Sequence, residues 1–141
     1  KYRQQIIYRS KHLTIINDSK STSYSSSLSI LKSLSNVYWI VGGLAKKGDK
    51  FVLSKNDCKT FKAYIFGKSK NIFTKQLRKY MNCQNFSNLL LLIKKILLDI
   101  RNNNNQTILF SPAAASFDNF KNFEARGEYF NNLIKKVIND K

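Results

Sequence analysis

The segment TILFSPAAASFDNFKNFEARG, from Thr107 to Gly127, holds a strand, a turn and a helix start in close succession. The apolar run from Thr107 to Phe110 is typical of a buried strand, and Ser111-Pro112 ends regular pairing. Three alanines follow, and Ser116 and Asp118 then offer oxygens able to cap a helix. Apolar residues next recur at the spacing of one helical face, at Phe117, Phe120, Phe123, Tyr129, Phe130, Leu133, Val137 and Ile138. In an open α/β sheet, such a junction either binds a ligand or simply connects two elements.

The same two kinds of pattern alternate along the rest of the chain. Short β-prone or apolar runs predict strands over Gln4 to Tyr8, Leu13 to Ile16, Val37 to Val41 and Ala63 to Phe66. Spaced apolar residues predict helices from near Ser23, over Ile72 to Tyr80 and over Asn88 to Ile100, with a short helical segment at Leu53 to Lys59. Loops are expected at Leu44 to Lys50 and Asn102 to Asn105, and a turn or short strand at Met81 to Gln84. The alternation predicts an α/β fold with a mostly parallel sheet of about six strands, helices on both faces, and Gln4 to Tyr8 as an antiparallel edge strand.

Length and charge limit the class of protein. A chain of 141 residues with 43% apolar content suits a single domain over residues 1–141. The formal net charge of +17 favours a nucleic acid or an anionic surface as partner, but most of the cations are lysines, whereas phosphate and base recognition favours arginine. The longest apolar stretch, Leu89 to Leu98, is interrupted by Lys94-Lys95 and is too short to span a bilayer. We therefore expect no membrane insertion, and nucleic-acid binding stays an alternative.

The chain begins at Lys1 and its one methionine is Met81, so we expect a piece of a longer protein. The opening residues are charged but are not followed by an apolar run, so we expect no signal peptide at the start. Cys58 and Cys83 are far apart, and His12 is the one histidine, so we expect no metal site and no disulfide. Free thiols in a reducing cytoplasm are the expected state.

Three loops of the predicted sheet should meet at the carboxyl ends of its parallel strands. They run over Asn17 to Ser23, Gly42 to Lys50 and Ser111 to Asp118. Together they offer hydroxyls, cations and one carboxylate, from Asp18, Lys20, Thr22, Lys46, Lys47, Ser111 and Ser116. Such a set can hold carboxylates or phosphates, although each residue alone is also explained as a helix cap, a turn hydroxyl or a solvated charge. The chain has no phosphate-cradling loop of the G-x-x-x-x-G-K-[ST] type, so nucleotide hydrolysis by this piece alone is not expected.

Taken together, these loops resemble the carboxy-terminal domain of the Mur ligase family, in the branch that adds D-glutamate. The resemblance rests on INDSKST at Ile16 to Thr22, GGLAK at Gly42 to Lys46 and SPAAASFDNFKNFEARG at Ser111 to Gly127, and it extends along the whole chain. It implies a Rossmann-like third domain of an ATP-dependent ligase of peptidoglycan synthesis. The domains that bind the UDP-sugar and hold the P-loop and magnesium would be absent, so this domain alone would be inactive.

The resemblance also implies roles for individual residues. Thr22 and Lys46 would hold the side-chain carboxylate of D-glutamate. Ser116 and the backbone near Phe117 and Phe123 would orient the amino-acid end. A dicarboxylate requires a cation and neutral donors at fixed separation, which this set can supply.

On the nucleotide side, the resemblance implies that Arg3 and Asp18 contact ATP, with Asp18 at the ribose hydroxyls. Lys20 matches a lysine close to the reacting phosphate and is the candidate catalytic residue. ATP and magnesium would be held mainly by the absent central domain, and UDP-N-acetylmuramoyl-L-alanine would bind outside this chain. The family implies a cytoplasmic bacterial enzyme, here expected to be a monomer.

Some positions depart from the family pattern. Ser21 stands where alanine is common, Ser23 where asparagine is usual, and Ala114 where cysteine is frequent, but none of these changes removes a proposed ligand. Lys46 and Lys47 are adjacent, and spacing favours Lys46. Two other functions remain open from the sequence: a basic nucleic-acid-binding module, and a non-functional relic of the ligase.

Overall fold

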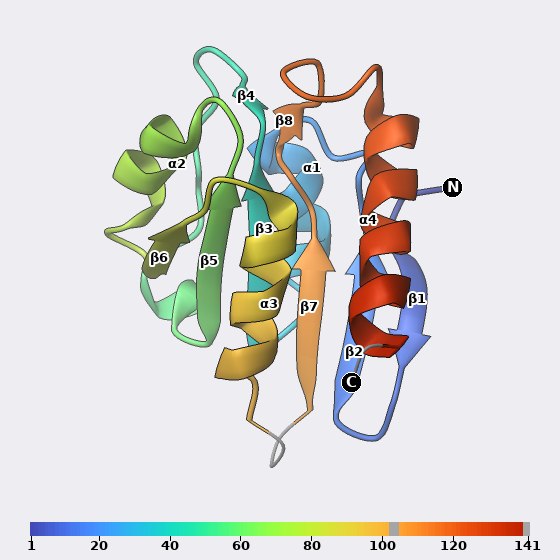
Figure 1. Cartoon of the computed structure of the whole chain (residues 1–141). Coiled ribbons are helices and arrows are strands. Elements are labelled where there is room, and N and C mark those ends of the chain that lie inside the picture. Colours follow the sequence, from blue (N-terminus) through green and yellow to red (C-terminus); the bar gives the residue numbers. More distant parts are fainter. Residues whose placement is uncertain (102–104, 140–141) are drawn as a thin grey trace.

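A six-stranded sheet in the order β1-β2-β7-β3-β5-β6 forms the centre of the computed structural model, which describes residues 1–101 and 105–139 (Figure 1). Its strands are β1 (Gln5–Arg9), β2 (Leu13–Asn17), β7 (Gln106–Phe110), β3 (Val37–Gly42), β5 (Phe61–Phe66) and β6 (Asn82–Asn85). All neighbours are parallel except β1, which pairs antiparallel with β2 at one edge. The predicted α/β fold, its Rossmann-like character and its antiparallel edge strand are confirmed.

Two helices cover each face of the sheet (Figure 1). Helices α1 (Tyr24–Leu31) and α2 (Lys70–Leu77) share one apolar core with one face, whereas α3 (Leu89–Asp99) and α4 (Phe123–Asn139) share a second core with the other. All six residues of β3 are buried because both of its faces are covered. Alternate residues of β3 therefore enter opposite cores, with Trp39 in the first and Ile40 in the second.

Helix α4 begins later than the sequence predicts. Ser116 and Asp118 do not cap it: the Ser116 carbonyl accepts hydrogen bonds from the amides of Asn119 and Phe120, which makes a turn. The helix starts at Phe123, where the Asn122 side chain accepts from the Ala125 amide at 2.8 Å. The expectation of a helix from Phe117 was wrong, because a spacing of three residues between aromatic side chains also occurs in a turn, and Phe117 is 71% exposed rather than packed.

Other boundaries moved by a few residues. The predicted loop from Leu44 and the predicted alanine turn each contain a two-residue strand, β4 (Leu44–Ala45) and β8 (Ala114–Ala115), and the two pair antiparallel. Strand β5 begins two residues before Ala63, α2 runs from Lys70 rather than from Ile72, and the segment near Met81 provides edge strand β6. The helical segment predicted at Leu53 to Lys59 is a single turn, η1 (Asn56–Cys58). Asn102 to Asn104 of the predicted loop lie outside the described residues.

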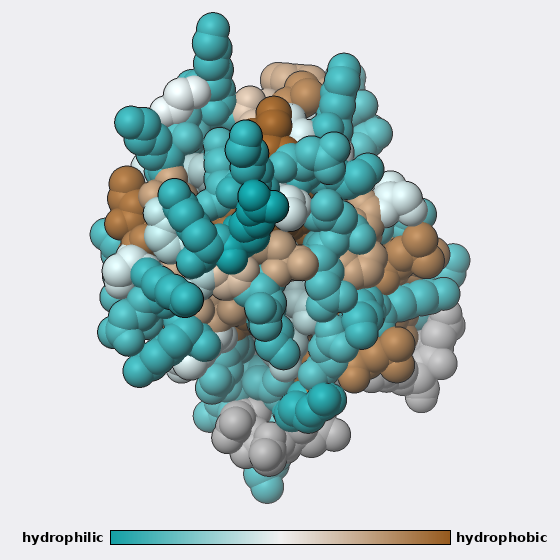
Figure 2. Space-filling view, turned by 90° about the vertical axis from the view of Figure 1, so that its left-hand side faces the viewer, coloured by the Kyte–Doolittle hydropathy of each residue, from teal (hydrophilic) through white to brown (hydrophobic). Residues whose placement is uncertain are grey.

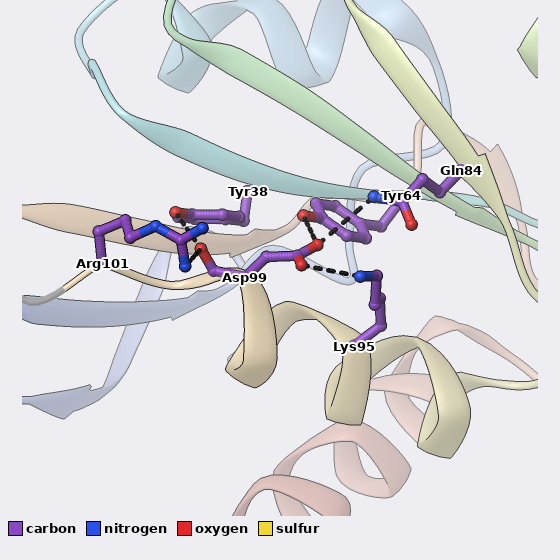
Figure 3. A network of polar contacts seen from close by, with 6 residues as sticks. All are labelled: Tyr38, Tyr64, Gln84, Lys95, Asp99 and Arg101. Carbon is purple, nitrogen blue, oxygen red and sulfur yellow. Dashed lines mark hydrogen bonds and ion pairs between the residues drawn. The ribbon is translucent and has the colours of Figure 1, made fainter.

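A polar network closes the end of α3 that lies at the amino ends of the strands (Figure 3). The Asp99 carboxylate accepts from the Tyr64 hydroxyl at 2.7 Å and forms an ion pair with Lys95 at 2.9 Å. Gln84 donates to the same carboxylate at 3.4 Å. Burial would raise the pKa of the Asp99 carboxyl, but the bonds from Lys95, Tyr64 and Gln84 and the charge of Lys95 outweigh it, so this pKa lies below its ordinary value.

We expect Asp99→Asn to lower stability at neutral pH but not in acid. The pKa is lower in the folded than in the unfolded chain, so the stabilisation is present above about pH 4 and is lost as the pH falls through the folded value. At pH 7 the loss should be about 1.5–3 kcal/mol, the typical contribution of a hydrogen bond to a charged group. Urea unfolding along a pH series measures it, with Glu128→Gln, which alters an exposed carboxylate, as control. A loss of equal size at every pH would contradict this assignment.

Positive charge is dense in one segment of the chain, residues 46–79. Residues 46–79 contain eleven lysines and arginines against two aspartates. This segment forms most of the left-hand part of Figure 1, and Figure 2, which views the molecule from that side, shows a largely hydrophilic surface. Among the described helices, none has the length and apolar character needed to cross a membrane.

Candidate functional site

The carboxyl ends of β2 and β7 form the topological switch point of the sheet. The chain leaves β2 toward α1 on one face of the sheet and leaves β7 toward α4 on the other, and the two strands are neighbours. Neighbouring strands whose connections diverge in this way leave space for a ligand at their carboxyl ends. The first residue of the loop after β2 is bonded to the end of β7, since the Asp18 amide donates to the Phe110 carbonyl at 2.7 Å.

A buried chain of hydroxyl groups leads to Asp18, the first residue after β2. The Ser111 hydroxyl donates to one Asp18 oxygen at 2.6 Å. The Ser27 hydroxyl of α1 lies 2.6 Å from that of Ser111, and the Ser21 hydroxyl lies 2.6 Å from that of Ser27. Because Ser111 donates to the carboxylate, its oxygen is free to accept from Ser27, which can in turn accept from Ser21. The chain therefore directs its donors toward the Asp18 charge.

Asp18 itself is 3% exposed. Its second carboxylate oxygen accepts from the backbone amide of Gln4 at 3.0 Å. Burial has the largest influence and raises the pKa of the Asp18 carboxyl, against the bonds from Ser111 and Gln4 and the charge of Arg3. The orientation of the Asp18 carboxylate is thus fixed by Ser111 after β7, which Ser27 of α1 supports, and by Gln4 in the amino-terminal segment.

The three residues predicted to face the nucleotide come together. Arg3, Asp18 and Lys20 line one depression of about 280 Å³, together with Gln4 and the serines Ser21, Ser25, Ser26 and Ser29. Two cations and one carboxylate at a hydroxyl-rich surface can bind phosphates and sugar hydroxyls. Arg3 and Lys20 are exposed, so both are accessible to a ligand.

Two of the residues predicted to hold the amino acid, Lys46 and Ser116, directly follow the two strands of the small sheet of β4 and β8. Leu44 pairs with Ala115 and Ala45 with Ala114, so Lys46 and Ser116 leave this sheet at opposite ends. Lys46 is exposed, whereas Ser116 is 3% exposed. Thr22 is exposed between two buried serines, and the second of these, Ser23, caps α1.

The two aromatic positions differ in environment. Phe117 is 71% exposed at the turn after Ser116. Phe123 is the first residue of α4 and is partly buried, and its carbonyl accepts from the Ser19 hydroxyl at 2.7 Å. Lys20 Nζ lies 5.8 Å from the centre of the Phe123 ring, so the nucleotide-side and amino-acid-side residues meet here.

Arg126 is a residue that the sequence analysis left without a role. It is completely buried and forms hydrogen bonds with the loop after β2 and with β8. One signal points to it: Arg126 occupies the apolar face of α4, three residues after Phe123 and four before Phe130. A cation at a core position of a helix indicates a specific buried partner.

The part of the chain at residues 1–101 and 105–139 contains no group of three His, Cys, Asp or Glu that could hold a metal ion. Cys58 and Cys83 are free thiols, as predicted, and burial raises the pKa of each to about 11. Burial has the largest influence at both, so neither thiol is activated as a nucleophile.

No protein-family model matches this chain. It is similar to the UDP-N-acetylmuramoylalanine--D-glutamate ligase of Wolbachia sp. subsp. Brugia malayi (strain TRS), with 36% identity over 140 residues, covering 97% of this chain and 28% of the relative. The enzyme of the same name from Rickettsia felis is 35% identical over 138 residues, covering 96% and 30%. That from Hydrogenobaculum sp. is 34% identical over 139 residues, covering 98% and 33%. The chain therefore spans a third or less of the length of these relatives.

Proposed function

We propose that this chain, a homologue of the carboxy-terminal domain of UDP-N-acetylmuramoylalanine–D-glutamate ligases in the Mur ligase family, binds D-glutamate and closes over ATP in such a ligase. The gathering of Arg3, Asp18 and Lys20 in one depression just after the carboxyl end of β2 carries the proposal. The complete ligation would require the rest of a ligase, because the chain corresponds to 28% of its Wolbachia relative.

On the nucleotide side, Arg3 and Lys20 provide positive charge for the phosphates, and Asp18 accepts from the ribose hydroxyls. The existing bonds of Asp18 do not prevent this, because each carboxylate oxygen can accept more than one hydrogen bond. Gln4 and Ser111 then act as the groups that orient the carboxylate before the nucleotide binds.

On the amino-acid side, Lys46 and Thr22 bind the side-chain carboxylate of D-glutamate, and Ser116 with the backbone near Phe117 and Phe123 orients the other end. The placement of Lys46 and Ser116 at opposite ends of the β4–β8 sheet supports this division, since the two ends of a dicarboxylate must be held at separate points.

The contribution of the domain is proximity and charge stabilisation. ATP supplies the phosphoryl group that converts the carboxylate of UDP-N-acetylmuramoyl-L-alanine into an acyl phosphate. The chain's own residues hold the D-glutamate amine beside the acyl carbon, so that a C–N bond forms, the amine loses a proton and phosphate leaves. Lys20 neutralises negative charge on the reacting phosphate. Magnesium would be held outside this chain.

A hybrid ligase tests the proposal directly. This chain would replace the matching segment of the Wolbachia enzyme, and phosphate release would be measured with ATP, UDP-N-acetylmuramoyl-L-alanine and D-glutamate. We expect release that requires D-glutamate and produces the ligated nucleotide. A folded hybrid with no such release, beside an active parent enzyme, would refute the proposed function. Binding of labelled RNA or DNA at physiological salt would instead support the basic-module alternative.

Lys46→Ala should weaken the use of D-glutamate by the hybrid. Loss of a charged hydrogen-bond donor costs about 1.5–3 kcal/mol, which predicts a rise of about ten- to a hundredfold in the KM for D-glutamate. Lys47→Ala is the matched control, because it removes another exposed lysine one position away. Equal effects of the two substitutions, or an unchanged KM in Lys46→Ala, would contradict the assignment of Lys46.

A further inference from the structure

Arg126, a residue of α4, is completely buried. Its guanidinium donates hydrogen bonds to backbone carbonyls and one hydroxyl rather than to a carboxylate. Nη2 donates to the Ser19 carbonyl at 2.6 Å and to the Ser21 carbonyl at 3.3 Å. Nη1 donates to the Ala114 carbonyl at 2.8 Å, and Nε donates to the Ser19 hydroxyl at 3.0 Å. Among the described residues no carboxylate lies within ion-pair distance of it. All three nitrogens are thus bonded, to the loop between β2 and α1 and to strand β8.

The acceptors flank the candidate site residues. Ser19 and Ser21 are the neighbours of Lys20 on either side, so one nitrogen binds the carbonyls of both residues that flank that lysine. Ala114 lies in β8, two residues before Ser116. The planar fork of a single arginine therefore sets the β2–α1 loop and the β8 strand relative to each other.

The arrangement costs stability that an apolar residue would not cost. Burial lowers the pKa of the Arg126 guanidinium to about 10, so it is still a cation at pH 7 and must be desolvated. A buried cation that is satisfied by carbonyls and one hydroxyl, with Asp118 contributing only through its charge, is weakly stabilising at best, whereas its hydrogen bonds are directional. Local geometry therefore explains this residue better than global stability does.

We infer that Arg126 is a positioning residue that holds Lys20 and Ser116 in the relative placement that ligation requires. Arg126 acts through the carbonyls of Ser19, Ser21 and Ala114 and has no contact with substrate. Lys20 is also held from the other side, since its amide donates to the Tyr2 carbonyl at 2.9 Å. The inference about catalysis rests on the proposed function, whereas the inference about loop geometry does not.

Hydrogen exchange on this chain tests the geometric step. Arg126→Ala should accelerate exchange of the Lys20 and Ser21 amides, which bond to Tyr2 and Asp18, by about tenfold or more, while the Trp39 and Ile40 amides change little. Guanidinium ion, added far below denaturing concentrations, should restore protection by filling the vacated space. Arg101→Ala, at an exposed arginine, is the control. It should leave the exchange of the Lys20 and Ser21 amides unchanged, with or without guanidinium ion. Uniform acceleration over the whole sheet, or no rescue, would overturn the inference.

Arg126→Lys covers the case in which the alanine variant does not fold. It keeps the cation but replaces the planar fork by a point charge, so the local acceleration at Lys20 and Ser21 should persist. In the hybrid ligase the same variant should lower kcat by about tenfold or more with a smaller change in the KM for ATP. An unchanged kcat in an active hybrid would overturn the catalytic part. An inactive unmutated hybrid would instead refute the proposed function and leave exchange as the deciding measurement.

Discussion

Gly42→Ala should destabilise the fold more than any other addition of one methyl group at its glycines. Gly42 ends β3 with φ +147°, and a Cβ there would lie 2.0 Å from the Phe66 carbonyl oxygen and 2.8 Å from its carbon. Both atoms belong to the backbone of the neighbouring strand β5, so the rotation of a side chain cannot relieve the clash. The Gly42 amide also donates to the Pro112 carbonyl at 3.0 Å, which couples any shift to the loop after β7. Overpacking and the unfavourable φ together predict a loss of about 3–4 kcal/mol.

Urea unfolding of the intact chain measures this loss as a shift of the midpoint at unchanged m-value. Gly48→Ala is the matched control, because Gly48 also has a positive φ of +77° but nothing lies within 4 Å of its added Cβ. The control should cost only about 1–2 kcal/mol, the price of φ alone. Equal losses in the two variants would show that the contact with Phe66 is not what requires glycine.

Long apolar patterns made most of the fold predictable. The run VYWIV is typical of a buried strand, and β3 is buried throughout. The short pair β4–β8 could not be recognised, because two residues show no periodicity and the pairing partner lies about seventy residues away. The false helix start at Phe117 has a similar cause: the spacing of Phe117, Phe120 and Phe123 is compatible with a helix, and only the tertiary placement of the turn decides against it.

The candidate site was predictable as a set of loops but not as a network. Alternation of strands and helices is enough to bring the loops after β2, β3 and β7 to one edge. It gives no sign that Ser27, one of many serines in α1, would reach Ser111 from the next layer. Ser21, which departs from the family pattern, proves to be buried and bonded to Ser27. The buried arginine was hidden for the same reason, since its acceptors lie more than a hundred residues away in Ser19 and Ser21.

Lys20→Met should cause the largest loss of activity in the hybrid ligase. The Lys20 side chain is exposed at the depression that it shares with Arg3 and Asp18, so its removal should change stability by less than about 0.5 kcal/mol. Removing a preorganised group that faces developing charge costs about a hundred- to a thousandfold in kcat. We therefore expect a fall of that size in kcat at saturating ATP and D-glutamate, with unfolding by urea unaltered.

Two further variants separate this role of Lys20 from a general effect of charge. Lys20→Arg keeps the cation and should recover part of the lost rate, because a positive charge remains near the phosphate although its shape differs. Lys32→Met removes an exposed lysine just after α1, outside the depression, and should keep kcat within about twofold. If Lys20→Met raised only the KM for ATP, Lys20 would bind the nucleotide without acting on the reacting phosphate. A matching loss in Lys32→Met would instead point to the overall charge of +17 acting at long range, and the catalytic assignment would fail.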